Sequence, residues 1–565
     1  MKYVYKITTM WFLVVMTVLS VEAQQIKVKL DEPKQEFEGA GVSIGLFMGH
    51  HYSMNAENQA KAIRMINKDL NMKYLQDYIG IYPSDDAQYF DRRANYIKAA
   101  KVHRPDIQVS MVGNIFPDNL RTDIVVNGRT YAVLDTDDPE IYDKLADWYF
   151  QLFKGFHDRG VEVDIFNVVN EPDLANCANQ CRKYHYGLNG DTQKAVALVF
   201  TQAVPKFLEM LNDPQINTTN MKVPLIMGPS TISPNGCLSY LRYFKANYPE
   251  AWDLIDIVAT HQYINGARND LFEEILVEAE GKPIHQSETH ASRFANQADD
   301  LGTLPVSDGH RTSLSLARLF GVAVNNGTSA WYYFENNYPN EFHPGGLIHV
   351  AWASENPVPY KHYYAYQQLT TAQPAFSNVM EQELVDIGKS EIVSFRKSDE
   401  DTVYVNIANF TGDAKAYLVQ MEDNTGLRDM SAMTVTNTDE TNDANVIENT
   451  VFTAPQDRVI FRADPYSLNT LKLTLSNVIT SLEDRIDRSA LRVWQEGKNL
   501  MVETRTTAII ESFSLVSAHG QYVIESAKPT NGRLEIALNT LNSGVYLVNV
   551  VTSQGRESRK IHVNN

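Results

Sequence analysis

Short apolar runs alternate with amphipathic helical stretches between residues 24 and 375. This alternation is the pattern of βα units on a parallel sheet. We count eight apolar runs, and that number predicts a closed (β/α)8 barrel, the TIM barrel of the α/β class. The predicted strands span residues 37–43, 72–76, 107–112, 163–169, 225–228, 257–261, 283–286 and 329–333. Helices are expected at residues 56–70, 87–100, 138–160, 191–211, 237–247, 271–279 and 312–325, with a closing helix at 360–371.

The pattern changes after the predicted barrel, which we bound at residues 24–375. Residues 376–476 read as alternating strands without convincing helices, which favours a β-sandwich. A charged segment at residues 477–490 is interpreted as a linker, and residues 491–565 are again all strands. The chain is therefore expected to hold a barrel followed by two β domains.

Residues 1–23 have the order of a secretory signal peptide. Lys2 and Lys6 precede an apolar segment, and Val21-Glu22-Ala23 supplies a small-x-small cleavage site. The apolar segment is too short to span a bilayer, and no later stretch is apolar for long enough. We expect an exported protein without a transmembrane segment.

Composition narrows the class of ligand. The 565 residues carry a formal net charge of -19, which argues against nucleic acid because phosphate binding requires clustered Lys and Arg. The chain contains 29 Tyr, 23 Phe and 6 Trp, which suit stacking on sugar rings, although most of them are expected in the core. A neutral or weakly charged ligand fits this balance best.

Two predicted strands end in a carboxylic acid. The fourth runs apolar into Asn170-Glu171-Pro172, and the seventh ends in Ser287-Glu288. The carboxyl ends of parallel barrel strands meet on one face, so the two acids are expected to lie close together. Splitting a glycosidic bond needs such a pair, because one group protonates the leaving oxygen while the second faces the sugar.

Asn-Glu-Pro on the fourth strand and Ser-Glu on the seventh resemble the retaining glycoside hydrolases of clan A. The resemblance covers about residues 35–373 and implies that Glu171 is the acid/base and Glu288 the nucleophile. In that mechanism the two carboxyl groups lie about 5–5.5 Å apart. Asn170 would then hydrogen-bond the sugar 2-hydroxyl.

Further residues are assigned to the substrate site. His261 and Tyr263 end the sixth strand, where the clan carries a His or Tyr that can donate to the nucleophile. Trp331 on the eighth strand is the expected stacking platform, with core packing as the alternative. His50 and His51 follow the first strand and are expected to contact carbohydrate or to lie on the surface, rather than to bind a metal.

One feature departs from the clan. Many members carry an arginine at the end of the second strand, whereas Tyr74-Leu75-Gln76-Asp77-Tyr78 contains none. Either another cation stabilises Glu288, or the site solves this problem differently.

Three cysteines are present. Cys177 and Cys181 lie four residues apart just after Glu171 and could form a disulfide or remain free thiols, and Cys237 stands alone. These positions do not form a zinc pattern. No cofactor is expected.

The last stretch resembles the C-terminal sorting domain of the type IX secretion system. The resemblance rests on Gly544-Val545-Tyr546-Leu547-Val548 and on the terminal strand Lys560-Ile561-His562-Val563. It implies contact with the type IX machinery and a secreted or outer-membrane surface location in a Gram-negative bacterium. A third β-sandwich without a sorting role is the alternative.

These observations together favour a secreted, monomeric, retaining endo-β-glycosidase that acts on a polysaccharide. A marine galactan such as agarose or porphyran is favoured; the alternative is a β-glucanase or β-xylanase of the family-30 type, which the opening Glu36-Phe37-Glu38-Gly39 resembles. Two hypotheses from another class are a non-catalytic glycan-binding protein on a barrel scaffold and an adhesin that binds through its C-terminal sandwiches.

Overall fold

The computed structural model describes residues 24–45, 48–79, 87–113, 116–126, 129–173, 192–291, 301–338, 345–350, 356–371, 375–397, 400–476 and, with short gaps, 491–563. The predicted signal peptide, the 477–490 linker, Cys177 and Cys181 lie outside the described residues.

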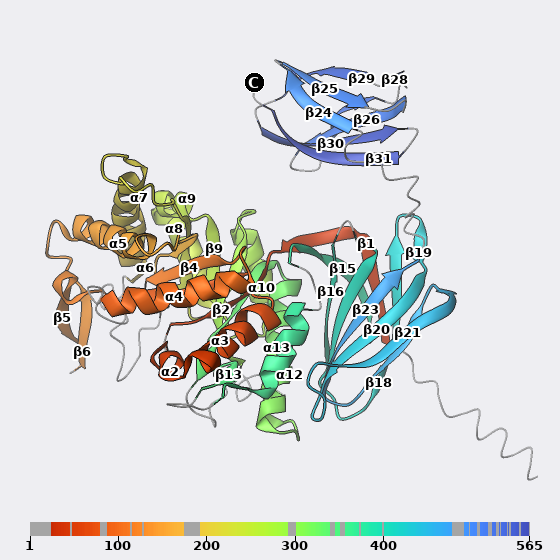
Figure 1. Ribbon diagram of the computed structural model, residues 1–565, viewed down its shortest axis with the longest axis horizontal. Helices are drawn as coiled ribbons and strands as arrows, with labels where there is room; N and C mark the ends of the chain where they lie inside the picture. The colour runs from red at the N-terminus through yellow and green to blue at the C-terminus, as the bar shows by residue number, and fades with distance from the viewer. Residues whose placement is uncertain are drawn as a thin grey trace, which may run out of the picture. The chain divides into compact units, whose positions relative to one another are not determined.

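The predicted barrel is confirmed (Figure 1). Eight parallel strands close in the order β10-β11-β2-β3-β4-β7-β8-β9, so each strand neighbours the next barrel strand along the chain. The strands are β2 (Gly39–Ser43), β3 (Tyr74–Ile79), β4 (Gln108–Gly113), β7 (Ile165–Asn167), β8 (Leu225–Thr231), β9 (Ile257–His261), β10 (Ile284–Thr289) and β11 (Thr328–Tyr333). Each overlaps one of the eight apolar runs.

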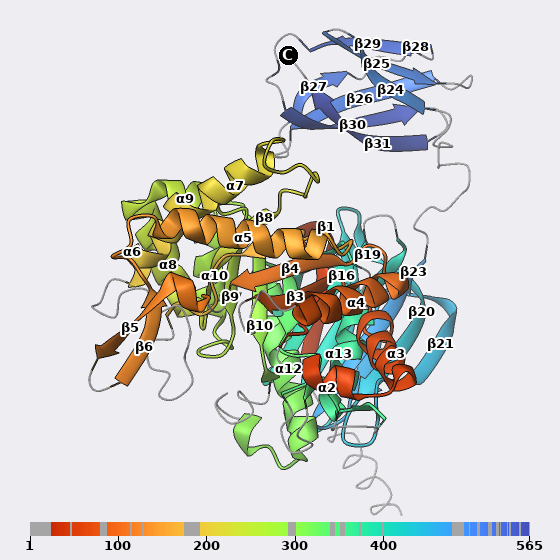
Figure 2. The same ribbon diagram turned by 60° about the vertical axis from the view of Figure 1, so that its left-hand side comes forward.

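Helices connect the strands and lie on the outside of the barrel (Figures 1 and 2). They are α2 (Met48–Ser53), α3 (Ala56–Arg64), α4 (Ala87–His103), α5 (Ile141–His157), α6 (Thr192–Leu198), α7 (Val204–Asn212), α8 (Pro234–Asn247), α9 (Pro249–Leu254), α10 (Asn269–Glu278), α12 (Asp308–Asn325) and α13 (Lys361–Thr371). Shorter helical turns are η1 (Met65–Asp69), η2 (Asp118–Leu120), η3 (Val199–Ala203) and η4 (Leu301–Thr303).

Local caps fix several helix starts. Ser233 accepts a hydrogen bond from the Gly236 amide at the start of α8, and Ser307 accepts one from the His310 amide at the start of α12. Each cap satisfies an amide that lacks a partner within its helix. The first residues of α8 thus lie immediately after β8, beside the barrel mouth.

Alternation along each strand divides the barrel core into two layers. Tyr74, Ile257, Ala330 and Tyr332 belong to a cluster inside the barrel, whereas Trp331 belongs to the larger cluster that includes helix residues. Successive strand side chains point to opposite faces, which explains the division. The inner layer blocks the barrel below the strand ends, so the site must lie above it.

A ten-stranded sheet packs beside the barrel and corrects the predicted boundary at residue 24. Strand β1 (Gln24–Phe37) belongs to this sheet, where it pairs with β15 in antiparallel and with β18 in parallel orientation (Figure 1). The other members are β15 (Ser377–Val385), β16 (Ser390–Arg396), β17 (Thr402–Asn409), β18 (Lys415–Asp423), β19 (Gly426–Arg428), β20 (Met430–Thr438), β21 (Asn445–Gln456), β22 (Val459–Ala463) and β23 (Ser467–Leu475). The barrel therefore starts at β2.

Aromatic and amide side chains join the barrel to this sheet. The Phe37 ring centroid lies 5.6 Å from those of Phe320 on α12 and Phe395 on β16. The Gln368 amide on α13 donates to the carbonyl oxygens of Thr436 and Leu468, each at 3.1 Å. Residues up to Leu475 accordingly form one compact unit.

Residues 476–565 form a second compact unit. Its strands are β24 (Leu491–Glu496), β25 (Asn499–Thr504), β26 (Ile509–Ser517), β27 (Tyr522–Ser526), β28 (Thr530–Asn531), β29 (Arg533–Ala537), β30 (Gly544–Thr552) and β31 (Gly555–Val563). They make a three-stranded and a five-stranded sheet around a core that includes Leu500, Phe513 and Val548.

The loops that connect barrel elements contain one two-stranded and one three-stranded sheet. The hairpin of β5 (Arg121–Val126) and β6 (Arg129–Leu134) stands away from the barrel in both views, and β12 (Asn337–Tyr338), β13 (Ile348–His349) and β14 (Val358–Pro359) follow β11. Of the helices in the described ranges, none is both long and apolar enough to cross a membrane.

Candidate active site

The two acids predicted from the strand ends meet at the barrel mouth. One carboxylate oxygen of Glu171, one of Glu288 and one ring nitrogen of His261 all lie within 4.8 Å of one another. Both acids are largely buried, with 6% of Glu171 and 5% of Glu288 exposed. A separation of this size leaves no room for a water between the carboxyl groups, as the inverting geometry would require.

Each acid is held by a different local structure. Glu288 is the second-last residue of β10, so its backbone is held by the neighbouring strands. Glu171 follows β7 with φ 46°, and its amide donates to the Ser230 carbonyl oxygen at 2.8 Å. The apolar run therefore ends before Glu171, and the turn that follows aims its carboxyl group at the mouth.

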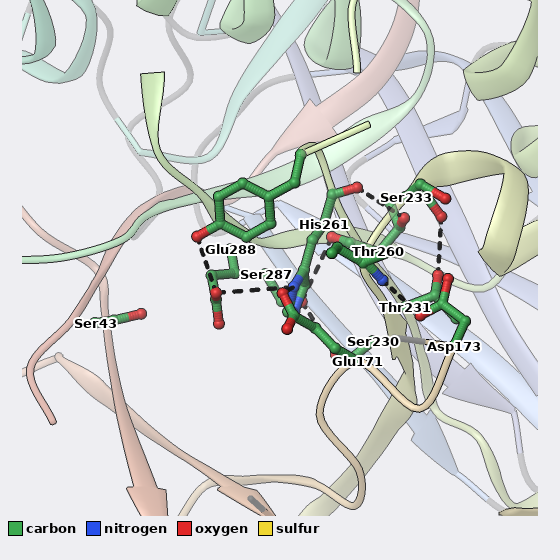
Figure 3. A network of polar contacts seen from close by, with 12 residues as sticks. Ser43, Glu171, Asp173, Ser230, Thr231, Ser233, Thr260, His261, Ser287 and Glu288 are labelled. Atoms are coloured by element: carbon green, nitrogen blue, oxygen red, sulfur yellow. Dashed lines mark hydrogen bonds and ion pairs between the residues drawn. The ribbon is translucent and has the colours of Figure 1, made fainter. Parts of the chain in front are cut away.

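His261 lies between the two acids (Figure 3). Its Nδ1 is 3.1 Å from Glu171 Oε1 and 3.9 Å from Glu288 Oε1. The imidazole is fully buried at the end of β9. The shorter contact joins His261 to Glu171, whereas the sequence led us to expect the end of the sixth strand to donate to the nucleophile Glu288.

Two tyrosine hydroxyls donate hydrogen bonds to Glu288. Tyr263 donates to Oε1 at 2.9 Å, and Tyr78 at the end of β3 donates to Oε2. Burial, reinforced by the charge of Glu288, raises the pKa of both hydroxyls well above 10. Both groups remain protonated donors over the whole working pH range, and donors to the charged form favour an ionised Glu288.

Asp173 is a third acid near the site that sequence reasoning missed. Its Oδ1 accepts a hydrogen bond from the Ile232 amide at 2.8 Å, which ties the turn after Glu171 to the loop before α8. Burial, with a smaller contribution from the charge of Glu171, raises the pKa of Asp173 to about 6. The position two residues after Glu171 was its only sequence signal.

Trp331 does not form the predicted stacking platform. Its side chain is fully buried, its ring packs against Phe320 and Tyr366, and its Nε1 donates to Gln262 Oε1 at 2.8 Å. The prediction was wrong because strand alternation turns Trp331 outward, towards the helices.

Phe334 is the aromatic residue at the mouth on this side. It follows the last residue of β11 and is partly exposed. Its ring stacks on His290 with centroids 6.4 Å apart and meets Tyr78 edge-on at 6.0 Å. Because Tyr78 donates to Glu288, this contact with Tyr78 places Phe334 near the predicted nucleophile.

The other predicted substrate residues have mixed outcomes. His51 is buried against Tyr96 at a centroid distance of 5.0 Å, and burial lowers its pKa to about 4, so the predicted surface role was wrong and its contact with carbohydrate stays a prediction. His50 is 9% exposed, and Asn170 is 3% exposed beside Glu171. Their contacts with sugar stay predictions.

The same carboxylates and imidazole are the only group among the described residues whose donor atoms are arranged to hold a metal ion. Two carboxylates and one imidazole suit a divalent ion chemically. An ion there would occupy the space between the acids that a sugar must enter. Catalysis by the acid pair therefore requires this space to be free of metal.

Comparison with known proteins separates the two compact units. Residues 497–564 match the family model described as a secretion system C-terminal sorting domain. A search of the curated proteins finds no match.

Solved structures resemble the unit that contains the barrel. A GH30 endoxylanase from Clostridium papyrosolvens C71 has a TM-score of 0.58 at 16% identity, over 80% of this chain and 100% of that chain. A conserved exported protein from Bacteroides fragilis has a TM-score of 0.61 at 12% identity, over 79% and 100%. An endo-β1,6-glucanase has a TM-score of 0.55 at 13% identity, over 80% and 94%. At such identities the likeness shows a shared fold.

Proposed function

We propose that the barrel is a retaining glycoside hydrolase that cleaves a polysaccharide internally. The observation that carries this proposal is the approach of the Glu171 and Glu288 carboxylate oxygens to within 4.8 Å on the ends of the fourth and seventh barrel strands. A pair about 5–5.5 Å apart is the arrangement for double displacement.

The reaction proceeds in two displacements. Glu288 attacks the anomeric carbon while the bond to the leaving oxygen breaks, and Glu171 transfers its proton to that oxygen. Glu171, now ionised, then removes a proton from water, which attacks the anomeric carbon and releases Glu288. Atoms and charge balance without a cofactor.

The surroundings of the two acids support this division of roles. Glu288 accepts hydrogen bonds from Tyr78 and Tyr263, which favours its charged form as a nucleophile. Glu171 interacts electrostatically with Asp173, and a like charge disfavours ionisation. Two hydroxyl donors on Glu288 and a like charge near Glu171 are the unequal surroundings that a nucleophile and an acid require.

The identity of the polysaccharide is a separate part of the proposal. The similar structures include an endoxylanase and an endo-β1,6-glucanase, which supports a β-linked xylan or glucan as the backbone. The marine galactans favoured by the sequence resemblance have no such support and enter the test as competitors. Phe334 is proposed as the stacking platform for the reacting sugar.

The experiment is a screen of the purified protein on xylan, β-1,6-glucan, laminarin, agarose, porphyran and carrageenan, read by reducing ends and product size. We expect hydrolysis of one backbone to mixed oligosaccharides. Glu288→Gln should lower kcat by about 10⁴-fold or more, since the variant lacks the nucleophile for the covalent step, while the polysaccharide still binds. Glu274→Gln, on an exposed face of α10, is the control and should keep wild-type activity.

A non-catalytic glycan-binding protein is the competing function. It predicts that the wild type binds one polysaccharide without releasing reducing ends and that Glu288→Gln changes affinity alone. Binding without cleavage on every polysaccharide would overturn the hydrolase.

We also propose that the protein is exported, on the basis of its C-terminal unit. The match of residues 497–564 to a sorting domain supports delivery by a secretion system, with residues 1–23 as the signal peptide. Deleting residues 497–564 in the native host should leave the enzyme inside the cell envelope, as measured by fractionation and immunoblotting.

A further inference from the structure

Tyr78 is a strand residue whose hydroxyl reaches the acid on the far side of the barrel mouth. Its strand, β3, is separated from β10 by β11 and β2 around the barrel, yet its hydroxyl donates to Glu288 Oε2. We propose that Tyr78 is a positioning residue for the nucleophile, holding Glu288 as an oriented anion with a neutral hydroxyl in place of a cation. This inference rests on the proposed function.

The ring of Tyr78 is fixed from two sides. A side chain at Gly45 would come within 2.8 Å of Tyr78 Cδ2, so only glycine allows the ring to lie there without a shift. Phe334 meets the same ring edge-on at 6.0 Å. A ring held in this way costs little reorganisation when charge develops on Glu288.

A buried cation on a neighbouring helix supports the backbone of Tyr78 through Asp77. Arg93 on α4 forms a buried ion pair with Asp77, and Asp77 Oδ1 accepts the hydrogen bond of the Tyr78 amide at 2.8 Å. Arg93 also lies over the Tyr89 ring. The guanidinium thus orients the strand end that carries Tyr78.

Neighbouring groups determine which way the Tyr78 hydroxyl points. Gln76 Nε2 lies 3.4 Å from the Tyr78 oxygen and donates to it, while the same Nε2 donates to the Ser287 carbonyl oxygen at 2.8 Å. The Ser43 hydroxyl lies 3.3 Å away. A phenolic oxygen that accepts from Gln76 keeps its own proton for Glu288, and the ionised carboxylate is the stronger acceptor of that hydrogen bond.

Together the two tyrosines give Glu288 one donor on each oxygen. Whichever oxygen attacks the anomeric carbon, the other keeps its hydrogen bond through the ester intermediate. As the ester breaks in the second step, charge returns to Glu288 and both bonds strengthen again. Tyr78 is therefore expected to keep Glu288 oriented and ionised before the first displacement and to stabilise its returning charge in the second.

Other titratable groups also face Glu288. They are His261 on β9, Tyr263 after β9 and Glu171 after β7, with Asp77 and Arg93 behind Tyr78 and His290 behind Phe334. All of these remain when Tyr78 becomes phenylalanine. A change in the ionisation of Glu288 in Tyr78→Phe therefore reports the lost hydroxyl.

The kinetic test compares Tyr78→Phe with wild type on the polysaccharide that wild type hydrolyses. We expect kcat/KM to fall by about 10- to 100-fold, as for a lost hydrogen bond to a charged group. The acidic limb of the pH profile should move up by about one pH unit, because the anion of Glu288 loses a donor. Tyr263→Phe should behave alike, and Gln76→Met should shift the limb less in the same direction.

Tyr89→Phe is the control, since it removes a neighbouring hydroxyl that donates to the Tyr78 carbonyl oxygen at 3.3 Å and leaves the Tyr78 hydroxyl in place. It should leave the acidic limb in place. A Tyr78→Phe enzyme with an unmoved limb would overturn the inference, even if its rate were reduced, because a merely structural residue lowers rate without changing the pKa of Glu288.

A second measurement does not depend on turnover. Tm is recorded at pH 4 and pH 8 for wild type, Tyr78→Phe, Glu288→Gln and the double variant. If the Tyr78 hydroxyl stabilises ionised Glu288, Tyr78→Phe should lower Tm more at pH 8 than at pH 4, by about 2 °C or more. This loss of Tm should be smaller in the Glu288→Gln background, which has no carboxylate to stabilise. Equal losses in both backgrounds would refute the role of Tyr78, whereas a failed substrate screen with this coupling intact would refute the proposed function alone.

Discussion

At the scale of single residues, we expect the charge of Asp173 to oppose ionisation of Glu171. The pKa of Asp173 is raised to about 6, so this carboxyl group is ionised at pH 7–8. Asp173→Asn removes that charge and keeps an oxygen for the Ile232 amide. We expect the basic limb of the kcat/KM profile to move down by about half to one pH unit, with a smaller difference from wild type below pH 6.

The matched control for that variant is Asp158→Asn at the exposed end of α5. It should leave both limbs of the profile unchanged. A basic limb that stays in place in Asp173→Asn would show that Asp173 anchors the turn without influencing proton transfer.

Substitutions at Phe334 and at Trp331 should have different effects, the first on substrate binding and the second on stability. Phe334→Ala removes the aromatic face at the mouth, and we expect KM to rise by about 10-fold with little change in Tm, as for a lost stacking contact. Trp331→Phe instead leaves a cavity among buried rings and the Gln262 amide without its donor, so Tm should fall while KM stays. Steady-state kinetics and thermal melts check both. An unchanged KM in Phe334→Ala would remove Phe334 from the substrate site.

These two positions show how far residue patterns reach. The strand-end acids were predictable, because an apolar run that stops in Asn170-Glu171 or Ser287-Glu288 exposes a carboxyl group at the barrel mouth. Trp331 was mistaken for the platform, although the period of two along β11 puts it on the same face as Tyr333 and opposite to Tyr332. The hydrogen bond from Tyr78 to Glu288 crosses the barrel, and no local pattern encodes such a contact.

At the scale of elements, Glu391 makes the contact between α12 and β16 sensitive to pH. Its side chain is 14% exposed, and burial raises its pKa to about 7 despite Arg318 at 3.6 Å and the Asn325 amide at 3.0 Å. The folded chain therefore holds this proton between pH 4.5 and 7, whereas the unfolded chain releases it. The free energy of unfolding should fall across that window, by about 3 kcal/mol at most.

Glu391→Gln tests this sign. The variant cannot ionise, so its Tm should fall less than that of wild type between pH 4.5 and 8, as measured by differential scanning calorimetry. Two Tm curves that stay parallel across this range would mean that Glu391 does not titrate within it.

The order of strands and helices along the chain was largely predictable. The sheet to which each strand belongs was not. All eight barrel strands follow from apolar runs between helical stretches, since each strand is local in sequence. Strand β1 was assigned to the barrel domain because alternation in residues 24–37 does not reveal its partners, which lie at β15 and β18. Long-range pairing of this kind becomes visible only in the fold.

At the scale of the whole molecule, the two compact units should be separable. Ending the chain at residue 476 removes a unit with its own core, so we expect the Tm of the remaining unit and its kcat to match the full chain. Ending it at residue 375 strips the partners of β1 and exposes Phe37 and Phe320, and we expect insoluble protein. Calorimetry and solubility assays check both. Loss of kcat in the longer fragment would assign the C-terminal unit a part in catalysis.

Glu171 and Glu288 are proposed to perform a double displacement at one sugar ring. The most direct test is the anomeric configuration of the first product, followed by ¹H NMR from the start of hydrolysis on the polysaccharide found in the screen. Two displacements invert the anomeric carbon twice, so we expect the β signal of the new reducing end to appear first and the α signal to grow later by mutarotation. Initial appearance of the α anomer from a β-linked substrate would rule out double displacement.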